Sequence, residues 1–288
     1  MRKEGFVFPL VGPTYTSSSL PVGAQVTRNF YLEANPQGSE PVCLKPFPGL
    51  TAFAETGAGV NRGMGVFNNK LYTVTGQTLY EVASYGATTS IGTVLGVGRC
   101  SLISDGFQLV IAIGAGKPYT YDGTTLTQGT DVDLPNAAPV AFLNSRVVYE
   151  GANADVVFAD LNSPLDVKSA NITIAETHPD DILAVVAYKS QVYAFGSESI
   201  EPYYATGSGN PPYSPITNAT ISIGLHAIHS AKSNKNYLYF LGSDLMIYRI
   251  GGLQVQSIGN PAITQEIRKY TTTEDAYAVC FTLDSQDF

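Results

Sequence analysis

Two glutamates three residues apart, Glu198 and Glu201, are the side chains of this sequence best suited to acid–base chemistry. A pair of carboxylates flanking a glycosidic bond is the arrangement that most glycoside hydrolases use. Sugar sites usually stack the substrate on tryptophan, however, and this chain contains none. We therefore interpret the two glutamates as structural, and we keep glycoside hydrolysis as the leading enzymatic alternative.

The three histidines are the next candidates, because imidazole is a common metal ligand. Two residues separate His226 from His229, but the surrounding residues predict a strand or turn rather than a helix, and no cysteine is near. His178 lies beside Asp180 and Asp181 in a Pro-Asp turn that leads into an apolar strand. We interpret both groups as structural and expect no metal site.

Two glycine-rich segments match nucleotide-binding loops only in part. The spacing of Gly57-x-Gly59-x-x-x-Gly63 differs from that of the dinucleotide fingerprint. The run Gly114-Ala115-Gly116-Lys117 is similar to the end of a phosphate loop, but Pro118 follows where serine or threonine is needed. We therefore expect no cofactor site and no catalytic residue, and we predict that the protein is not an enzyme.

The charge balance argues against a protein that holds nucleic acid through its phosphates. The chain has 16 basic and 24 acidic residues, a net charge of −8, whereas affinity for phosphate depends on clustered lysine and arginine. DNA can still pass beside an acidic wall, which repels it.

No segment approaches the ~20 apolar residues of a membrane span. The three cysteines, Cys43, Cys100 and Cys280, lie too far apart for a disulfide framework or a zinc site. We interpret them as buried thiols in a reducing compartment.

Both glutamates lie in a predicted antiparallel meander over residues 175–207. Its strands, expected at Ile182–Ala187, Gln191–Phe195 and Ser199–Ala205, are rich in β-branched and aromatic residues and are bounded by turn-forming residues. The high Tyr and Phe content, with 28 Gly and 17 Pro, is typical of an all-β protein with many turns.

The same pattern of a polar tip followed by an apolar, aromatic strand recurs along the whole chain. A period of roughly 40–50 residues with about four short strands per repeat is typical of a β-propeller. A single four-stranded sheet leaves its faces bare, whereas radially arranged sheets cover one another. We predict a propeller of antiparallel meanders, most simply with six blades, with a seven-bladed ring or paired sheets as alternatives. The pattern is anchored by Tyr31, Tyr72, Ile111, Tyr149, Tyr193, Tyr239 and Tyr277.

Turn signals and one helix complete the predicted elements. Asn68-Asn69 marks the start of a hairpin over residues 68–82, and Asp122-Gly123 suits a type I′ turn. One short helix is expected at Pro261–Tyr270, because Pro fits the first helical turn and apolar residues at 263, 267 and 270 fall on one face. A last strand is expected at Tyr277–Leu283.

Several short motifs give the sequence a specific resemblance. They are FPGL (Phe47–Leu50), RG (Arg62-Gly63), KLYTVTGQTLYEV (Lys70–Val82), GRCS (Gly98–Ser101), YDGT (Tyr121–Thr124), AETHPDDI (Ala175–Ile182), AFGSESIEPYYATG (Ala194–Gly207) and GGLQVQSIGNPAITQEIRKYTTTEDA (Gly251–Ala276). In order and spacing this set resembles the packaged-DNA stabilisation proteins of short-tailed podovirus phages, also called tail accessory or tail hub proteins. These proteins continue beyond the segment that matches Ala276–Leu283, so features of their C-terminal part are not carried over.

The resemblance implies a structural role in the virion. Such proteins form a ring, by analogy a homohexamer, below the portal and its adaptor protein at the head-to-tail interface. They continue the DNA channel without binding DNA specifically, help to retain the packaged genome until ejection, and seat a tail needle or plug and tail fibres or spikes. The resemblance further implies assembly in the host cytoplasm and no membrane span.

We therefore expect an extended N-terminal arm, residues 1–28, and a single β-propeller domain, residues 29–288. The expected function is that of a ring-forming tail hub or nozzle. The alternative is a propeller-fold glycan-binding protein or glycosidase, since six-bladed propellers include glycosidases.

Overall fold

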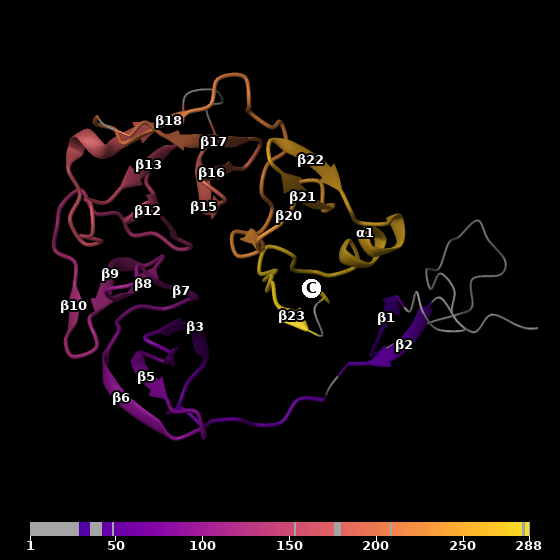
Figure 1. Cartoon of the computed structure of the whole chain (residues 1–288), viewed down its shortest axis with the longest axis horizontal. Coiled ribbons are helices and arrows are strands. Elements are labelled where there is room, and N and C mark those ends of the chain that lie inside the picture. The colour runs from indigo at the N-terminus through magenta and orange to yellow at the C-terminus, as the bar shows by residue number, and fades with distance from the viewer. Residues whose placement is uncertain are drawn as a thin grey trace, which may run out of the picture.

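The computed structural model describes residues 29–34, 42–47, 49–152, 154–175, 180–207, 209–283 and 286–287. The N-terminal arm predicted for residues 1–28 lies outside these ranges. Within them, five four-stranded antiparallel sheets follow one another along the chain and are arranged around a common centre (Figure 1).

The strands of the five sheets have short, regular lengths. The first sheet contains β3 Asn61–Phe67, β4 Lys70–Thr75, β5 Thr78–Val82 and β6 Thr88–Thr93. The second contains β7 Cys100–Ser104, β8 Leu109–Ile113, β9 Gly116–Tyr121 and β10 Leu126–Gln128. The third contains β11 Ala141–Leu143, β12 Arg146–Glu150, β13 Asp155–Phe158 and β14 Ile172–Ile174, preceded by a short 3₁₀ turn at Ser169–Asn171. The fourth contains β15 Ile182–Tyr188, β16 Gln191–Gly196, β17 Ile200–Ala205 and β18 Tyr213–Pro215, and the fifth contains β19 Lys232–Ser233, β20 Leu238–Leu241, β21 Ile247–Gly251 and β22 Gln254–Ser257.

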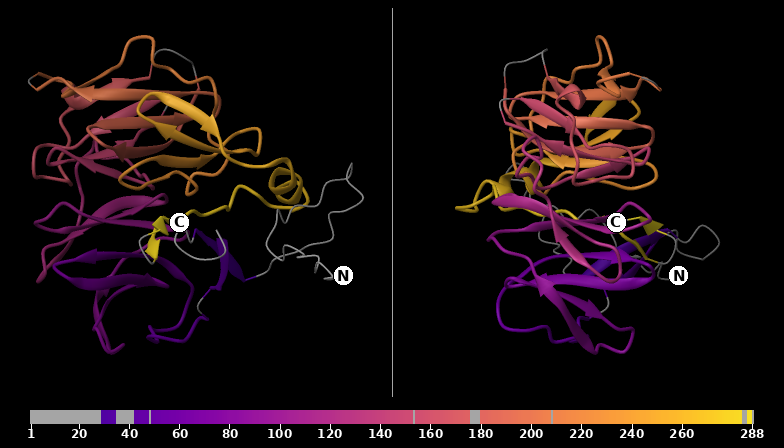
Figure 2. Two further views of the ribbon diagram at one scale, coloured as in Figure 1. Left: turned by 45° about the vertical axis from the view of Figure 1, so that its right-hand side comes forward. Right: turned by 90° about the vertical axis from the view of Figure 1, so that its left-hand side faces the viewer.

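Each sheet is a meander, because its strands pair in sequence order. Figure 1 shows the first strand of a sheet near the centre and the last strand at the outside, and Figure 2 shows the sheets from the side. The tight turns follow from local sequence. Asn68 and Asn69, between β3 and β4, have φ of 48° and 59°, values that asparagine tolerates better than most residues. The hairpin predicted over residues 68–82 is confirmed, because β4 and β5 pair in antiparallel register.

The predicted repeat is confirmed in the five sheets. The anchor residue of each sheet lies in its second strand; these residues are Tyr72, Ile111, Tyr149, Tyr193 and Tyr239. The two outer anchors behave differently, since Tyr31 belongs to a two-stranded sheet and Tyr277 lies outside the strands. The described ranges thus contain five four-stranded sheets, and a total of six blades stays a prediction.

The hydrophobic core lies between consecutive sheets. Four clusters of buried side chains join the first sheet to the second, the second to the third, the third to the fourth and the fourth to the fifth. Aromatic rings cross several of these boundaries: Tyr72 and Tyr121 have centroids 5.6 Å apart, and Phe195 and Phe240 have centroids 5.3 Å apart. Each sheet therefore buries its faces against its neighbours, which is the physical basis of a radial arrangement.

The segments at the two ends of the described chain complete the structure. Strands β1 Phe30–Ala34 and β2 Val42–Pro46 pair with each other, and so do β23 Thr282–Leu283 and β24 Gln286–Asp287. The helix α1 spans Pro261–Ile267.

The helix begins as its sequence predicts. Asn260 caps it by accepting a hydrogen bond from the Ile263 backbone N–H at 2.9 Å, and Pro261 fits the first turn. Among the described residues this helix is too short to cross a membrane, and no other helix there qualifies.

Three local predictions were wrong. The final strand does not begin at Tyr277, because residues 277–281 are not in a strand. The helix α1 ends at Ile267, whereas the prediction extended it to Tyr270. Asp122 does not have the positive φ that a type I′ turn needs; its carboxylate instead accepts hydrogen bonds from the N–H groups of Thr124 and Thr125.

Candidate interaction site at the open side of the ring

The described sheets leave one side of the ring without a four-stranded sheet. This open side lies between the fifth sheet (β19–β22) and the first sheet (β3–β6), and it holds α1, the β1–β2 hairpin and the segment of residues 268–283 (Figure 1). Among the described residues, none of the buried hydrophobic clusters joins the first sheet to the fifth across this side.

Exposed apolar side chains concentrate in the two segments that border the open side. These segments, residues 30–66 and 253–281, contain fourteen of the twenty-two large apolar side chains that are exposed in the described chain. They are Phe30, Phe47, Leu50, Phe53, Val60, Met64, Val66, Leu253, Ile258, Ile263, Tyr270, Tyr277, Val279 and Phe281. Apolar side chains that stay exposed in such numbers are candidates for contact with other protein segments.

Strand β3 shows how the open side acquires its apolar character. A Cβ at Gly63 or Gly65 would meet β7 of the second sheet, so these positions face the core. Because side chains alternate along a strand, Met64 and Val66 face the opposite way, toward the open side. Both side chains are exposed.

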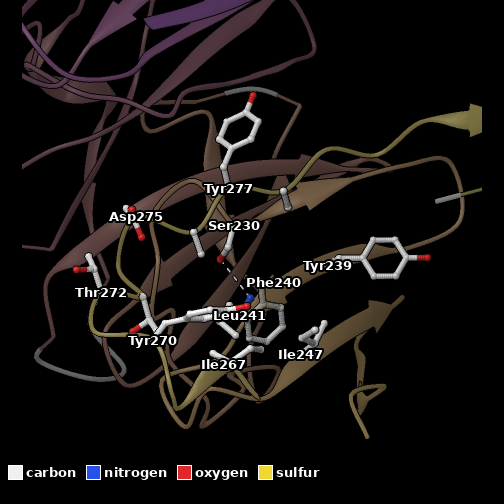
Figure 3. Close-up of a pocket in the computed structure, with 13 residues that line it drawn as sticks. Ser230, Tyr239, Phe240, Leu241, Ile247, Ile267, Tyr270, Thr272, Asp275 and Tyr277 are labelled. Carbon is white, nitrogen blue, oxygen red and sulfur yellow. Dashed lines mark hydrogen bonds between the residues drawn. The ribbon is translucent and has the colours of Figure 1, made fainter. Parts of the chain in front are cut away.

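A pocket of about 370 Å³ lies on the fifth sheet at this side. Its walls come from β20, β21, the end of α1 and the segment that follows it. Figure 3 shows Leu241, Ile247 and Ile267 at one end of the pocket, with the rings of Tyr239 and Tyr277 pointing away from them. Such a mostly apolar cavity suits an apolar or aromatic side chain rather than a charged ligand.

Hydrogen bonds hold the wall segment on the fifth sheet. His226 Nε2 lies 2.7 Å from Thr273 Oγ1, and the Ala278 N–H donates to the His229 carbonyl at 3.2 Å. Leu241 N–H donates to Ser230 Oγ at 3.2 Å beneath them (Figure 3). The two histidines therefore position this segment.

Tyr277 links the fifth sheet to the segment that leads into the second sheet. The guanidinium of Arg99, which precedes β7 in the second sheet, lies 4.8 Å from the centroid of the Tyr277 ring. Lys232 Nζ, on β19 of the fifth sheet, lies 5.5 Å from the same centroid, and the His229 ring lies 6.3 Å away. Cation–π attraction of this kind favours the observed position of the ring.

The surroundings of Tyr277 set the charge of the nearby groups. Burial, together with the smaller effect of the positive charges of Lys232 and Arg99, lowers the pKa of His229 to about 4. Burial also lowers the pKa of the Lys232 ammonium. His229 is therefore neutral at physiological pH.

We expect acid to loosen this corner of the structure through His229. The folded pKa of about 4 lies below the ordinary value of 6.5, so the folded chain binds fewer protons than the unfolded chain between these values. The stability that neutral His229 contributes is complete above pH 6.5 and is lost as the pH falls through about 4. His229→Gln should flatten this part of the pH–stability profile by on the order of 1 kcal/mol, a figure reduced for solvent screening of the partly exposed ring.

Urea unfolding midpoints of the wild type and His229→Gln at pH 7, 6, 5 and 4.5 give the comparison. The expected result is that the two curves converge toward low pH. Parallel curves across this range would show that His229 does not titrate between the two states in this way.

The structure separates the residues that the sequence offered for carbohydrate chemistry. Glu201 is buried on β17 and accepts a hydrogen bond from the Tyr203 hydroxyl at 3.1 Å, whereas Glu198 lies exposed in the turn before it. The Glu198 N–H donates to the Asp180 carboxylate at 2.7 Å, and that carboxylate also accepts the Ser199 N–H at 3.0 Å. Asp180 thus stabilises the β16–β17 turn, as expected of a turn residue.

The residues considered for metal or phosphate binding are not assembled into such a site among the described residues. His178 lies outside the described residues, and within the described ranges no group of three or more His, Cys, Asp or Glu side chains is placed to hold a metal ion. Lys117 Nζ donates to the backbone carbonyls of Val132 and Leu134, so it is engaged by a loop. The cation–π group around Tyr277 was not predicted, because its members lie up to 178 positions apart and no spacing connects them.

The fold and the comparisons define the class of protein. Four-stranded antiparallel meanders arranged around a centre and packed face to face define a β-propeller protein. A family model described as "Bacteriophage P22 Gp10, beta-propeller" matches residues 8–287. The chain belongs to this family, so the resemblance drawn from its motifs is confirmed.

The chain is also similar to a protein of known role. The chain is 28% identical over 261 residues to the tail hub protein gp10 of Salmonella phage P22, a match that covers 83% of this chain and 54% of that protein. The chain therefore spans about half the length of this relative.

Two solved structures are similar to this chain at low sequence identity, and the likeness to the first concerns the fold alone. The extracellular domain of a putative hybrid two-component system from B. thetaiotaomicron aligns with a TM-score of 0.50 at 12% identity, covering 72% of this chain and 29% of that one. YCF48 from Cyanidioschyzon merolae aligns with a TM-score of 0.49 at 13% identity, covering 77% and 76% of the two chains.

Proposed function

We propose that this protein is a non-enzymatic structural component of a phage tail, located in the virion at the head-to-tail interface. The observation that carries the proposal is the family match over residues 8–287. The similarity to a phage tail hub protein supports it. The apolar open side supports it, because a structural component needs surfaces that other proteins cover.

The proposed assembly is a ring of identical chains, with six as the number that the family resemblance suggests. A ring needs a heterologous contact, in which one surface of a chain meets a different surface of the next and the rotation closes. The open side, with Met64 and Val66 exposed on β3, is our candidate for one of the two surfaces. The portal adaptor, the tail needle or plug and the tail fibres or spikes are the further partners that we propose, after assembly in the host cytoplasm.

The proposed ring continues the DNA channel and lets DNA pass without specific binding. The net charge of −8 supports this role, because an acidic surface repels the phosphate backbone. Retention of the packaged genome and its release at ejection would then depend on the plug rather than on a grip of the ring on DNA.

A charge placed on the open side should block assembly. Val66→Asp adds a carboxylate to an exposed apolar position of β3, whereas Val132→Asp makes the same change at an exposed site far from the open side. We expect the wild type and Val132→Asp to form a multi-chain ring, measured by light scattering coupled to size exclusion, and Val66→Asp to remain monomeric. Equal assembly by both variants would exclude β3 from the ring contact.

Placement in the virion needs its own measurement, because a tail protein can stay monomeric until its adaptor is present. Gold-labelled antibodies against the chain should decorate the tail of purified virions in electron micrographs. Virions without label, together with a chain that binds or cleaves oligosaccharides on a glycan array, would favour the glycan-binding or glycosidase alternative.

A further inference from the structure

Arg62 is a buried cation without a carboxylate partner in the described part of the chain. It lies on β3 and is 7% exposed. Its Nε donates to the Gly98 carbonyl at 2.7 Å, and its Nη1 donates to the carbonyls of Gly76 and Val94, each at 3.2 Å. Its Nη2 is buried and has no hydrogen-bond partner among the described residues.

A pocket of about 500 Å³, which we name the Arg62 pocket, lies beside this side chain. It is formed where β3 begins, where β4 turns into β5 and where the chain passes from β6 to β7. Arg99 supplies a second guanidinium, and Asn61 and Gln77 supply amides. None of the described residues that line it is acidic.

The absence of an acid here contrasts with the rest of the protein. The chain has more acidic than basic residues, and the ion pairs among its described residues all use lysine. Arg99 contacts the Tyr277 ring, which attracts a cation but supplies no negative charge. A buried guanidinium with an unsatisfied N–H costs free energy, which an acceptor of opposite charge offsets.

A carboxylate suits the pocket for a geometric reason. A guanidinium presents parallel N–H donors that match two carboxylate oxygens, and such charge-assisted pairs are stronger than neutral hydrogen bonds. The rim is apolar, since Val60 and Val97 are 79% and 72% exposed. A charged centre surrounded by apolar side chains is typical of a site that binds a protein segment rather than a free ion.

We propose that the Arg62 pocket binds a carboxylate of a second protein chain, with the exposed Arg99 guanidinium as the hydrogen-bond donor, the buried positive charge of Arg62 beside it, and Val60 and Val97 as the contact rim. The carboxylate belongs either to an acidic side chain or to a chain terminus. The proposal stands on the pocket and does not require the ring assembly proposed above.

The test uses the full chain and small carboxylate probes. Thermal unfolding is measured at pH 7 in sodium acetate and in sodium chloride of equal ionic strength. Acetate should raise the Tm of the wild type by about 3 °C, because it binds only the folded chain. Gln77→Glu places a carboxylate in the pocket wall, so we expect a Tm higher than that of the wild type in chloride and no further response to acetate.

Gln254→Glu is the matched control, because it adds the same charge at an exposed position on β22 of the fifth sheet. It should keep the acetate response of the wild type and gain no stability. Calorimetric titration with N-acetylglycine and with N-acetylaspartate amide then separates a terminal carboxylate from a side-chain carboxylate. Arg99→Gln should weaken the better probe about tenfold, the loss expected when the charged hydrogen-bond donor is removed.

The proposal fails if the wild type does not respond to acetate and Gln77→Glu is no more stable than Gln254→Glu. That result would mean either that the pocket does not bind carboxylates or that an acid of the same chain already occupies it. Both are incompatible with a site for a second protein.

Discussion

Phe158→Ala should lower the free energy of unfolding by about 4 kcal/mol, because it empties the centre of the boundary between the third and fourth sheets. The Phe158 side chain is fully buried on β13. Its ring stacks on Tyr213 of β18 with centroids 4.8 Å apart and planes 11° apart, and it lies 6.5 Å from the ring of Tyr203 on β17. Removing it therefore eliminates apolar burial and two ring contacts.

A control at an exposed position isolates the effect of burial. Phe107→Ala makes the same change in the turn between β7 and β8, where the Phe107 side chain is 72% exposed. We expect its urea midpoint to stay close to that of the wild type. If Phe158→Ala costs less than about 1 kcal/mol in the same experiment, the third and fourth sheets do not pack as the structure has them.

Gly224→Ala should destabilise the protein by about 3 kcal/mol or more, through a steric clash between backbone atoms. A Cβ at Gly224 would lie well inside van der Waals distance of the Ser197 carbonyl and the Glu198 N–H. The backbone cannot move aside easily, because the Leu225 N–H donates to the Gly196 carbonyl at 2.8 Å and the Ser243 N–H donates to the Gly224 carbonyl at 2.9 Å. Gly224 thus allows turns of the fourth and fifth sheets to meet.

Gly114→Ala separates this clash from the general effect of replacing glycine. A Cβ at Gly114 meets nothing within 4 Å, and neither glycine has a positive φ. Both substitutions reduce the freedom of the unfolded chain in the same way, so the clash alone should distinguish them. We expect Gly114→Ala to unfold within about 0.5 kcal/mol of the wild type, and equal losses would contradict the close approach at Gly224. Thermal unfolding of both purified variants gives the comparison.

Phe158→Ala and Gly224→Ala both test the packing between neighbouring sheets. Each sheet contacts mainly the sheet before it and the sheet after it, so stability depends on the boundaries between them. The first and fifth sheets lack one such boundary in the described chain, and their exposed apolar side chains are the consequence. A contact with another protein at the open side would bury this surface.

The repeat and the positions of its anchor residues were predictable because they depend on local chemistry. Strand β16 begins at Gln191 as predicted and ends one residue after the predicted Phe195, since its apolar run is bounded by turn residues. The anchors at Tyr72 and Tyr193 both lie in the second strand of a sheet, where a side chain is covered by two neighbouring strands. The helix start at Pro261 was also predictable, because Asn260 and Pro261 are capping signals in the sequence itself.

Predictions failed where distant contacts override local preference. The segment after Tyr277 has the composition of a strand, but Ala278 bonds to His229 and Tyr277 packs against Arg99, so residues 277–281 do not extend a sheet.

The sequence by itself determined an all-β chain of repeated antiparallel meanders, its motif-based family and the positions of most strands. These depend on alternation, turn residues and strand-pair hydrogen bonds, which act over a few residues. Only the tertiary structure decided which side of the ring is open, which residues surround Tyr277 and that Arg62 is buried beside a pocket. Those features join residues from different strands and loops, and packing between the elements, rather than spacing along the sequence, brings them together.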